Sequence, residues 1–192
     1  MKRFFVLIAC LATGAVFVGH AAEAAGSAGS ESVTVPPILM QSKAGTQRAV
    51  QESYCLATVD EFGNPVFGCA DVFVDLPPRR LSVVRPGERV QIRLRDARIV
   101  LRSPGCGPDG RCEATVAVSR LGCRRIIARF DLKPSRTNWR ARLAPGAYDL
   151  RVFVGNFTTG SAAGDTSGSL GLLVDRNRPR KIISARGHAV CS

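Results

Sequence analysis

Residues 144–154 of the chain read Ala-Pro-Gly-Ala-Tyr-Asp-Leu-Arg-Val-Phe-Val, and this stretch decides the fold class. The pair Pro145-Gly146 is typical of a tight turn, and polar and apolar side chains alternate from Tyr148 to Val154. A period of two residues is expected of a strand that buries one face and exposes the other. The stretch therefore predicts a β-strand that begins just after a turn.

The same combination of turn and alternating segment recurs along the chain. Arg85-Pro86-Gly87 precedes an alternating segment at Val90–Leu94. Further segments of strand character lie at Ile99–Leu101, Ala114–Val118, Ile126–Leu132, Trp139–Leu143, Leu170–Val174 and Ile182–Ser184. Strands spaced by about 10–15 residues, with turns between them and no amphipathic helix, are typical of sandwiches and barrels. The sequence therefore predicts an all-β fold, an antiparallel β-sandwich.

Two of these segments resemble a known family. VRPGERVQIRL (84–94) and LAPGAYDLRVFV (143–154) are similar to strand openings in bacterial immunoglobulin-like or fibronectin-type-III-like sandwich domains. In those domains a Pro-Gly turn often leads into an alternating strand, and a Tyr commonly begins a late strand. The resemblance covers about residues 80–190. It implies an immunoglobulin-like sandwich with a role in adhesion, spacing or recognition, although such a fold does not by itself determine a function.

The first 24 residues have the three parts of an export signal. Lys2 and Arg3 supply positive charge, an uncharged apolar run extends from Phe4 to Val18, and Ala22-Glu23-Ala24 has the A-x-A form that signal peptidase reads. A run of about 15 residues is short for a bilayer core of roughly 30 Å. We therefore expect cleavage near Ala24 and release of a mature chain without a membrane-spanning segment, in the periplasm, the cell envelope or the extracellular medium.

Two alternatives to this signal remain open. The apolar run can stay uncleaved and act as an anchor. In addition, Leu7-Ile8-Ala9-Cys10 resembles a lipobox whose Cys would be acylated, but only six apolar residues precede Cys10, whereas a lipoprotein signal needs a full apolar region there.

The rest of the chain divides into two predicted parts. Residues 25–50 are rich in Gly, Ala, Ser and Pro and predict a flexible leader, with a short extended piece at Ser32–Leu39. The alternative for this part is a first strand that docks on the domain. Residues 51–192 contain the strand segments and predict one disulfide-linked β-sandwich domain of ordinary size.

Six cysteines remain after removal of the signal, and they are Cys55, Cys69, Cys106, Cys112, Cys123 and Cys191. An even number of cysteines in an exported chain indicates disulfides, and six cysteines allow about 15 pairings. Turn sequences favour two local pairs, because Phe62–Pro65 lies between the first two cysteines and Pro108–Gly110 between the next two. Cys123 would then join Cys191.

A zinc site is the alternative, but the cysteine spacings do not fit one and the mature chain has a single histidine, His188. We expect no metal and no cofactor.

Charge gives the remaining functional signal. The whole chain has a formal net charge of +12, and the mature part keeps about +11, almost all of it on arginine. Period-two spacing on the predicted strands, and one local cluster, select six arginines as candidates for binding anions: Arg93, Arg95, Arg140, Arg142, Arg178 and Arg180. Expected partners are an acidic glycan, a cell-wall polymer or an envelope protein. Nucleic acid is not expected, because export removes that partner and base-stacking aromatics are few. The oligomeric state is left open.

Catalytic motifs are weak by comparison. Gly164-Asp165-Thr166-Ser167-Gly168-Ser169 resembles the segment around the nucleophile of chymotrypsin-like proteases, but Thr166 is inserted and His188 follows the Ser instead of preceding it. The segment predicts a hairpin loop. We therefore expect a non-enzymatic binding or adhesion module, with a purely structural envelope protein and a serine hydrolase using Ser167 as the alternatives.

Overall fold

A computed structural model describes residues 34–60, 62–71, 77–104, 106–160 and 162–191. The predicted export signal, residues 1–24, lies outside these residues, as do residues 25–33 of the predicted leader. The described residues form strands, turns and loops, and no helix among them has the length and apolar character needed to cross a membrane.

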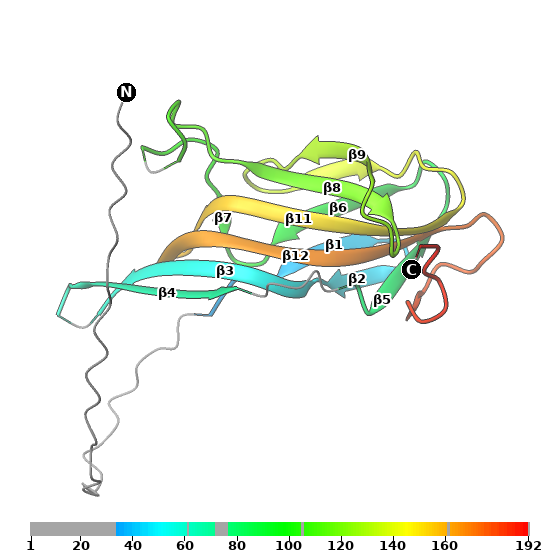
Figure 1. The fold of residues 1–192 in the computed structure, drawn as a ribbon, viewed down its shortest axis with the longest axis horizontal. Helices are drawn as coiled ribbons and strands as arrows, with labels where there is room; N and C mark the ends of the chain where they lie inside the picture. The colour runs from blue at the N-terminus through cyan, green and yellow to red at the C-terminus, as the bar shows by residue number, and fades with distance from the viewer. Residues whose placement is uncertain (1–33, 61, 72–76, 105, 161, 192) are drawn as a thin grey trace, which may run out of the picture. The chain divides into compact units, whose positions relative to one another are not determined.

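The strands form two sheets, as predicted for a β-sandwich (Figure 1). The smaller sheet has four strands, in the order β10 (Thr137–Arg140), β6 (Arg89–Leu94), β1 (Ile38–Ser42) and β2 (Gly45–Arg48). The strands of the larger sheet are β3 (Val50–Val59), β4 (Pro65–Asp71), β5 (Arg80–Val84), β7 (Arg98–Ile99), β8 (Ala114–Arg120), β9 (Ile126–Asp131), β11 (Gly146–Thr158), β12 (Ala162–Val174) and β13 (Ile182–Ser184).

The two long strands β11 and β12 form the centre of the larger sheet (Figure 1). On the outer side of β11 lie β8 and the short β7, and β9 follows β8. On the other side, β3 pairs with the first part of β12 and β5 with its last four residues. The β5–β12 pair is parallel, which departs from the antiparallel prediction. β4 and β5 run in the same direction along the sheet. β3 separates β4 from β12, whereas no strand separates β5 from the end of β12, so these two strands pair in parallel.

The core lies between the two sheets, and strand alternation places it there. On β6 the side chains of Val90, Ile92 and Leu94 are buried, and on β11 the inward positions from Tyr148 to Val154 are buried as well. These are the positions that the period of two assigned to an inner face. Phe130 of β9 and Trp139 of β10 stack with ring centroids 4.8 Å apart, so an aromatic pair joins the two sheets along one side of the sandwich.

Tyr148 holds the start of β11 in place. Its hydroxyl donates a hydrogen bond to the carbonyl of Ala144 at 2.6 Å, and the guanidinium of Arg120 lies 4.6 Å from the centre of its ring. Burial raises the pKa of Tyr148 more than the Arg120 cation lowers it, so the phenol stays a donor. A tyrosine bonded to the backbone four residues upstream has the geometry of the tyrosine corner found in Greek-key sandwiches. Membership of the immunoglobulin-like group remains a prediction.

The predicted leader is wrong for its second half. Residues 38–48 form the β1–β2 hairpin, and Ile38, Leu39 and Met40 are each at most 3% exposed. Gln47 of β2 is also buried, because its amide donates to the carbonyl of Arg80 at 2.9 Å and accepts from the hydroxyl of Ser82 at 2.8 Å. This hairpin completes the smaller sheet, so the alternative of a docked first strand is the correct one.

Other boundaries also differ from the prediction. Strand β5 was not expected, and β10 ends at Arg140 instead of continuing to Leu143. The predicted loop at Gly164–Ser169 is part of β12, which begins at Ala162. The loop prediction was wrong because side chains of β3, described below, bond to this segment and hold it as a strand.

Three disulfides join Cys55 to Cys69, Cys106 to Cys112 and Cys123 to Cys191, which confirms the favoured pairing. Cys55 and Cys69 lie directly opposite each other on β3 and β4, with their Cα atoms 4.1 Å apart. The third bridge ties the C-terminal segment to the turn after β8. A second, smaller apolar cluster lies near that segment, comprising Leu81, Val83, Leu121, Ala147 and Leu173, with Ile183 and Ala185 packed against it. Three disulfides are typical of proteins that fold in an oxidising compartment outside the cytoplasm.

Candidate anion-binding face

The outward-facing side of the four-stranded sheet carries the arginines of interest. Because Val90, Ile92 and Leu94 of β6 are buried, Arg89, Gln91 and Arg93 point to the opposite side. The strand register places outward residues of β10, β1 and β2 beside them. We call this surface the arginine face, and its residues are Gln41, Thr46, Arg48, Arg89, Gln91, Arg93, Asn138 and Arg140.

These residues form three rows that run across the strands. Arg140 lies opposite Arg89 in the first row. The second row is polar and uncharged, with Gln91 of β6 between Asn138 and Gln41, and Gln91 donates a hydrogen bond to Asn138 at 3.2 Å. In the third row, Arg93 and Arg48 lie on either side of Leu39, which is itself buried at 3% exposure. Neighbouring rows are about 7 Å apart, two residues along a strand. The face therefore has a central amide row with arginines on both sides.

Among the described residues, no acidic side chain pairs with Arg48, Arg89, Arg93 or Arg140. The four strands contain no Asp or Glu, and within the described part of the chain Arg48, Arg89 and Arg93 form no ion pair. Among the described residues, the hydrogen-bond partner of the Arg140 side chain is the backbone oxygen of Gly87, at 3.5 Å. Two like charges directly opposite each other on neighbouring strands are destabilising, so the Arg89–Arg140 pair does not serve stability. An anion bound across the pair would remove this repulsion.

One end of the arginine face is hollowed. A depression of about 450 Å³ is lined by Gln41, Gln91, Arg93, Ser135 and Arg136. A second one, of about 860 Å³, shares Arg93 and Ser135 with it and adds Arg98 and one carboxylate, Asp96. Three arginines thus line neighbouring hollows, a suitable place for a carboxylate, sulfate or phosphate group on a longer chain.

The structure separates the six predicted arginines into three groups. Arg93 and Arg140 lie on the arginine face, and Arg95 and Arg142 are exposed just beyond the ends of β6 and β10. Arg178 and Arg180 do not join them. They lie in the loop between β12 and β13, where Arg178 pairs with Asp175 at 3.4 Å and Arg180 with Glu88 at 2.9 Å.

Sequence reasoning missed four arginines that lie on or beside the face, namely Arg48, Arg89, Arg98 and Arg136. The period of two could have selected Arg89, since it precedes Arg93 by four residues on the same strand and so points to the same face. Arg48 was not, because its strand was assigned to the leader.

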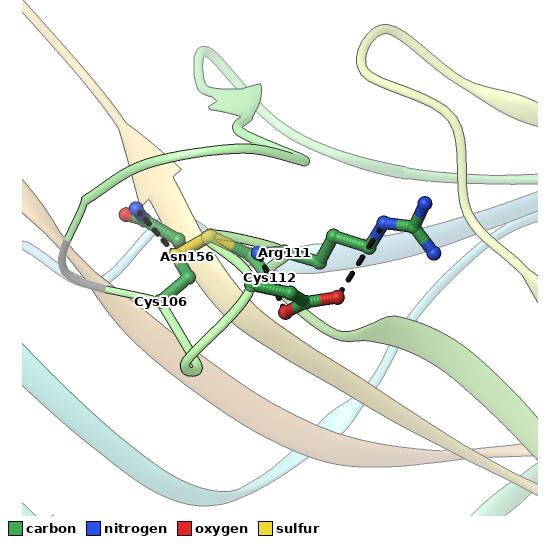
Figure 2. Close-up of a disulfide and its surroundings, with 5 residues drawn as sticks. Cys106, Arg111, Cys112 and Asn156 are labelled. Atoms are coloured by element: carbon green, nitrogen blue, oxygen red, sulfur yellow. Dashed lines mark hydrogen bonds and ion pairs between the residues drawn. A yellow bond between two sulfur atoms is a disulfide. The ribbon is translucent and has the colours of Figure 1, made fainter.

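In the loop closed by the Cys106–Cys112 disulfide, the charged residues pair with each other (Figure 2). The backbone N–H of Arg111 donates to the carboxylate of Asp109 at 3.1 Å, and its guanidinium lies 3.5 Å from the same group. The side-chain amide of Asn156 donates to the sulfur of Cys106 at 3.4 Å, which ties the loop to β11. Arg111 is therefore engaged within the loop.

The Gly164–Ser169 segment forms a seam between β12 and β3. The register of the β12–β3 pair shifts between Thr166 and Gly168, and a side chain links the two strands there. The side-chain amide of Gln51 donates to the Thr166 hydroxyl and to the Ser167 carbonyl. The Ser167 hydroxyl is bonded to that of Ser53 at 2.8 Å and accepts from the Ser53 N–H at 3.2 Å. His188 lies in the turn after β13, with its N–H bonded to the carbonyl of Ala185. These contacts give Ser167 a structural role.

We expect the Ser167→Ala substitution to lower the free energy of unfolding by about 1 kcal/mol, because it leaves the Ser53 N–H without its acceptor. Urea unfolding of the oxidised protein measures this change. Unchanged stability together with labelling of the wild type by a serine-reactive probe would contradict the structural role and favour the hydrolase alternative.

Within the described residues, no group of three His, Cys, Asp or Glu side chains is arranged to hold a metal ion. The arginine face is thus the strongest candidate site in this part of the chain. A scan of protein-family models, a search of curated proteins and a search of solved structures each found no significant match to this chain.

Proposed function

We propose that the mature chain acts outside the cytoplasm as a non-enzymatic module that binds an acidic polymer on its arginine face. The observation that carries the proposal is the row of opposed, unpaired arginines on a sheet that contains no acidic residue. Export of the chain is supported by the three disulfides and by the signal predicted for residues 1–24.

An acidic glycan fits this face better than a simple polyanion. Arginines attract carboxylate, sulfate or phosphate groups, but they do not need the amide row between them. Side-chain amides offer both donors and acceptors, which suit hydroxyl and acetamido groups of sugars. Because the face is broad and only shallowly hollowed, a ligand that extends across several strands suits it better than a small molecule.

We expect the double variant Arg89→Gln/Arg140→Gln to bind a polyuronate at least about tenfold more weakly than the wild type, a loss of about 1.4 kcal/mol. The reason is that it removes the opposed pair while keeping polar side chains there. Binding should also depend less steeply on salt, because fewer counterions are exchanged on binding. Titration calorimetry with polygalacturonate at two salt concentrations measures both effects.

A matched control keeps the change in net charge but moves it away from the face. Arg176→Gln/Arg186→Gln removes two exposed arginines from the segments that flank β13. This variant should keep wild-type affinity. Equal weakening in both double variants would show that only the overall charge matters and would contradict a specific face.

The amide row has its own test. Gln91→Ala/Asn138→Ala should weaken binding of polygalacturonate more than binding of polyphosphate, because sugar hydroxyls can use both the donor and the acceptor of an amide whereas phosphate oxygens use only the donor. An equal loss for both polymers would contradict the assignment of a glycan.

A further inference from the structure

The larger sheet has two long edge strands, β4 and β9, besides the three-residue edge strand β13. Along the path β4–β3–β12–β11–β8–β9, β4 pairs only with β3 and β9 only with β8 in the described part of the chain. An edge strand offers one row of unpaired N–H and C=O groups to another strand. Proteins usually protect such edges with charges, prolines or covering segments, so two open edges on one sheet need an explanation.

The β4 edge is apolar and acidic. Phe67 is 73% exposed and Val66 46%, and Phe62 at the tip of the hairpin is 80% exposed. From residue 49 to residue 78 the sequence contains no Lys or Arg, although the chain as a whole is strongly basic. Asp71 ends the strand, and Asp60 lies in the β3–β4 turn, where its carboxylate accepts the N–H groups of Phe62 and Asn64. The Cys55–Cys69 bridge holds β4 against β3, so the edge is preformed.

The β9 edge is apolar and basic. Ile126 is 51% exposed and Ile127 46%, large fractions for isoleucines in a strand. Arg124 and Arg125 precede the strand and are exposed. Within the strand, Arg129 is exposed and lies 4.0 Å from Glu113, and the exposed Asp131 ends it. The two edges are therefore alike in exposed apolar surface and similar in length, and they are opposite in charge where Asp71 ends β4 and Arg124 and Arg125 precede β9.

Strand directions allow the two edges to pair. Each neighbouring pair along the six-strand path is antiparallel, so β4 and β9 run in opposite directions at the two sides of one sheet. If a second copy is placed beside the first in the same orientation, its β9 meets β4 of the first as an antiparallel neighbour. The Asp71 end of β4 then lies toward the Arg125 end of β9, where the charges are opposite. The Asp60 turn lies toward the other end of β9, which contains Asp131 and is followed by Lys133.

We propose that copies of this chain associate edge to edge, with β4 of one copy pairing antiparallel to β9 of the next, so that the larger sheet continues from molecule to molecule. The contact is heterologous, because it joins two different edges, and each copy added leaves one edge of each kind free. The arginine face belongs to the other sheet, so a row of copies would present a row of arginine faces. The proposal does not depend on what that face binds.

Two edge variants of the oxidised mature protein test this arrangement. Phe67→Ser and Ile127→Ser alter side chains that are about half exposed or more, so both variants should fold and keep three disulfides. In sedimentation velocity we expect the wild type to form species that grow with concentration, and each variant alone to remain monomeric at the same concentrations. A mixture of the two variants should form a one-to-one dimer that grows no further, because it retains one intact β4 edge and one intact β9 edge.

Two controls separate the edges from other surfaces. Phe153→Ser removes an aromatic side chain that is 40% exposed on the central strand β11, and it should leave assembly unchanged. Arg89→Gln/Arg140→Gln should also leave it unchanged, which keeps this test independent of the proposed function. A wild type that is monomeric at all concentrations would overturn the proposal. So would a mixture of the two edge variants that stays monomeric.

Discussion

Replacing Gly171 by alanine is expected to lower the free energy of unfolding by about 3 kcal/mol, because the added methyl group has no room. Gly171 lies on β12 where that strand changes its neighbour from β3 to β5. A Cβ atom at this position would overlap the carbonyl oxygen of Arg80 and lie 2.6 Å from a methyl group of Leu81. Both obstacles belong to a buried strand pair, so the sheet has to move to accommodate the change.

Thermal unfolding measures the effect of Gly171→Ala, and a loss of about 3 kcal/mol corresponds to roughly 6–12 °C for a domain of this size. Gly68→Ala is the matched control. Gly68 lies on the exposed strand β4, and a Cβ there would meet nothing within 4 Å. We expect the control to be neutral or up to about 1 kcal/mol more stable, since alanine restricts the unfolded chain. Similar losses in both variants would contradict the close approach of β5.

Neutralising Glu88 is expected to cost about 2 kcal/mol at neutral pH, because its carboxylate accepts several hydrogen bonds, one of them from a cation. The Glu88 side chain is 5% exposed. It accepts from the N–H of Arg85 at 3.1 Å, from the N–H of Lys43 at 3.2 Å and from the guanidinium of Arg180 at 2.9 Å. It thereby joins the β1–β2 turn, the β5–β6 turn and the loop before β13. Glu88→Gln keeps the shape but removes the charge.

The pH dependence of this difference has a definite sign. Burial raises the pKa of Glu88, but the hydrogen bonds from Arg85, Arg180 and Lys43 outweigh it and hold the pKa below its ordinary value. A carboxyl whose pKa is lower in the folded state stabilises the fold above its unfolded pKa, and that stabilisation is lost on acidification. The stability gap between wild type and Glu88→Gln should therefore be full at neutral pH. It should shrink as the pH falls below about 4.3, the ordinary glutamate value.

Urea unfolding of both proteins across this pH range measures the gap, and Glu113→Gln serves as a control. Glu113 is largely exposed and lies 4.0 Å from Arg129, so its neutralisation should change stability by less than about 1 kcal/mol. A gap for Glu88→Gln that stays constant from neutral to acidic pH would contradict the role of the carboxylate charge.

Local signals in the sequence predicted much of the fold. Alternation and Pro-Gly turns located β6, β8, β9 and the first half of β11, because each of these strands buries one face only. They did not locate β1 and β2, which are short and have no Pro-Gly turn between them. In addition, β2 contains Gln47, a polar residue that is buried because it bonds to Arg80 and Ser82 of β5. They also misassigned Gly164–Ser169, whose small polar residues form a strand only because Gln51 and Ser53 bond to them.

The sequence also predicted only part of the candidate site. Period two selected Arg93 and Arg140, but it could not show that they share one sheet, since β10 and β6 are more than forty residues apart in the chain. It also selected Arg178 and Arg180, whose charges are compensated by Asp175 and Glu88. Whether an arginine is free or paired depends on which carboxylates the fold brings near, and Glu88 reaches Arg180 across 92 residues.

By itself, the sequence determined the all-β class, the export signal that we expect, the basic charge and the pairing of cysteines around turns, because each depends on near neighbours in the chain. Only the tertiary structure decided that residues 38–48 form a hairpin of the smaller sheet, that β5 runs parallel to β12, and that arginines without an ion pair among the described residues collect on one face. These features arise from contacts between distant segments, which no local pattern encodes.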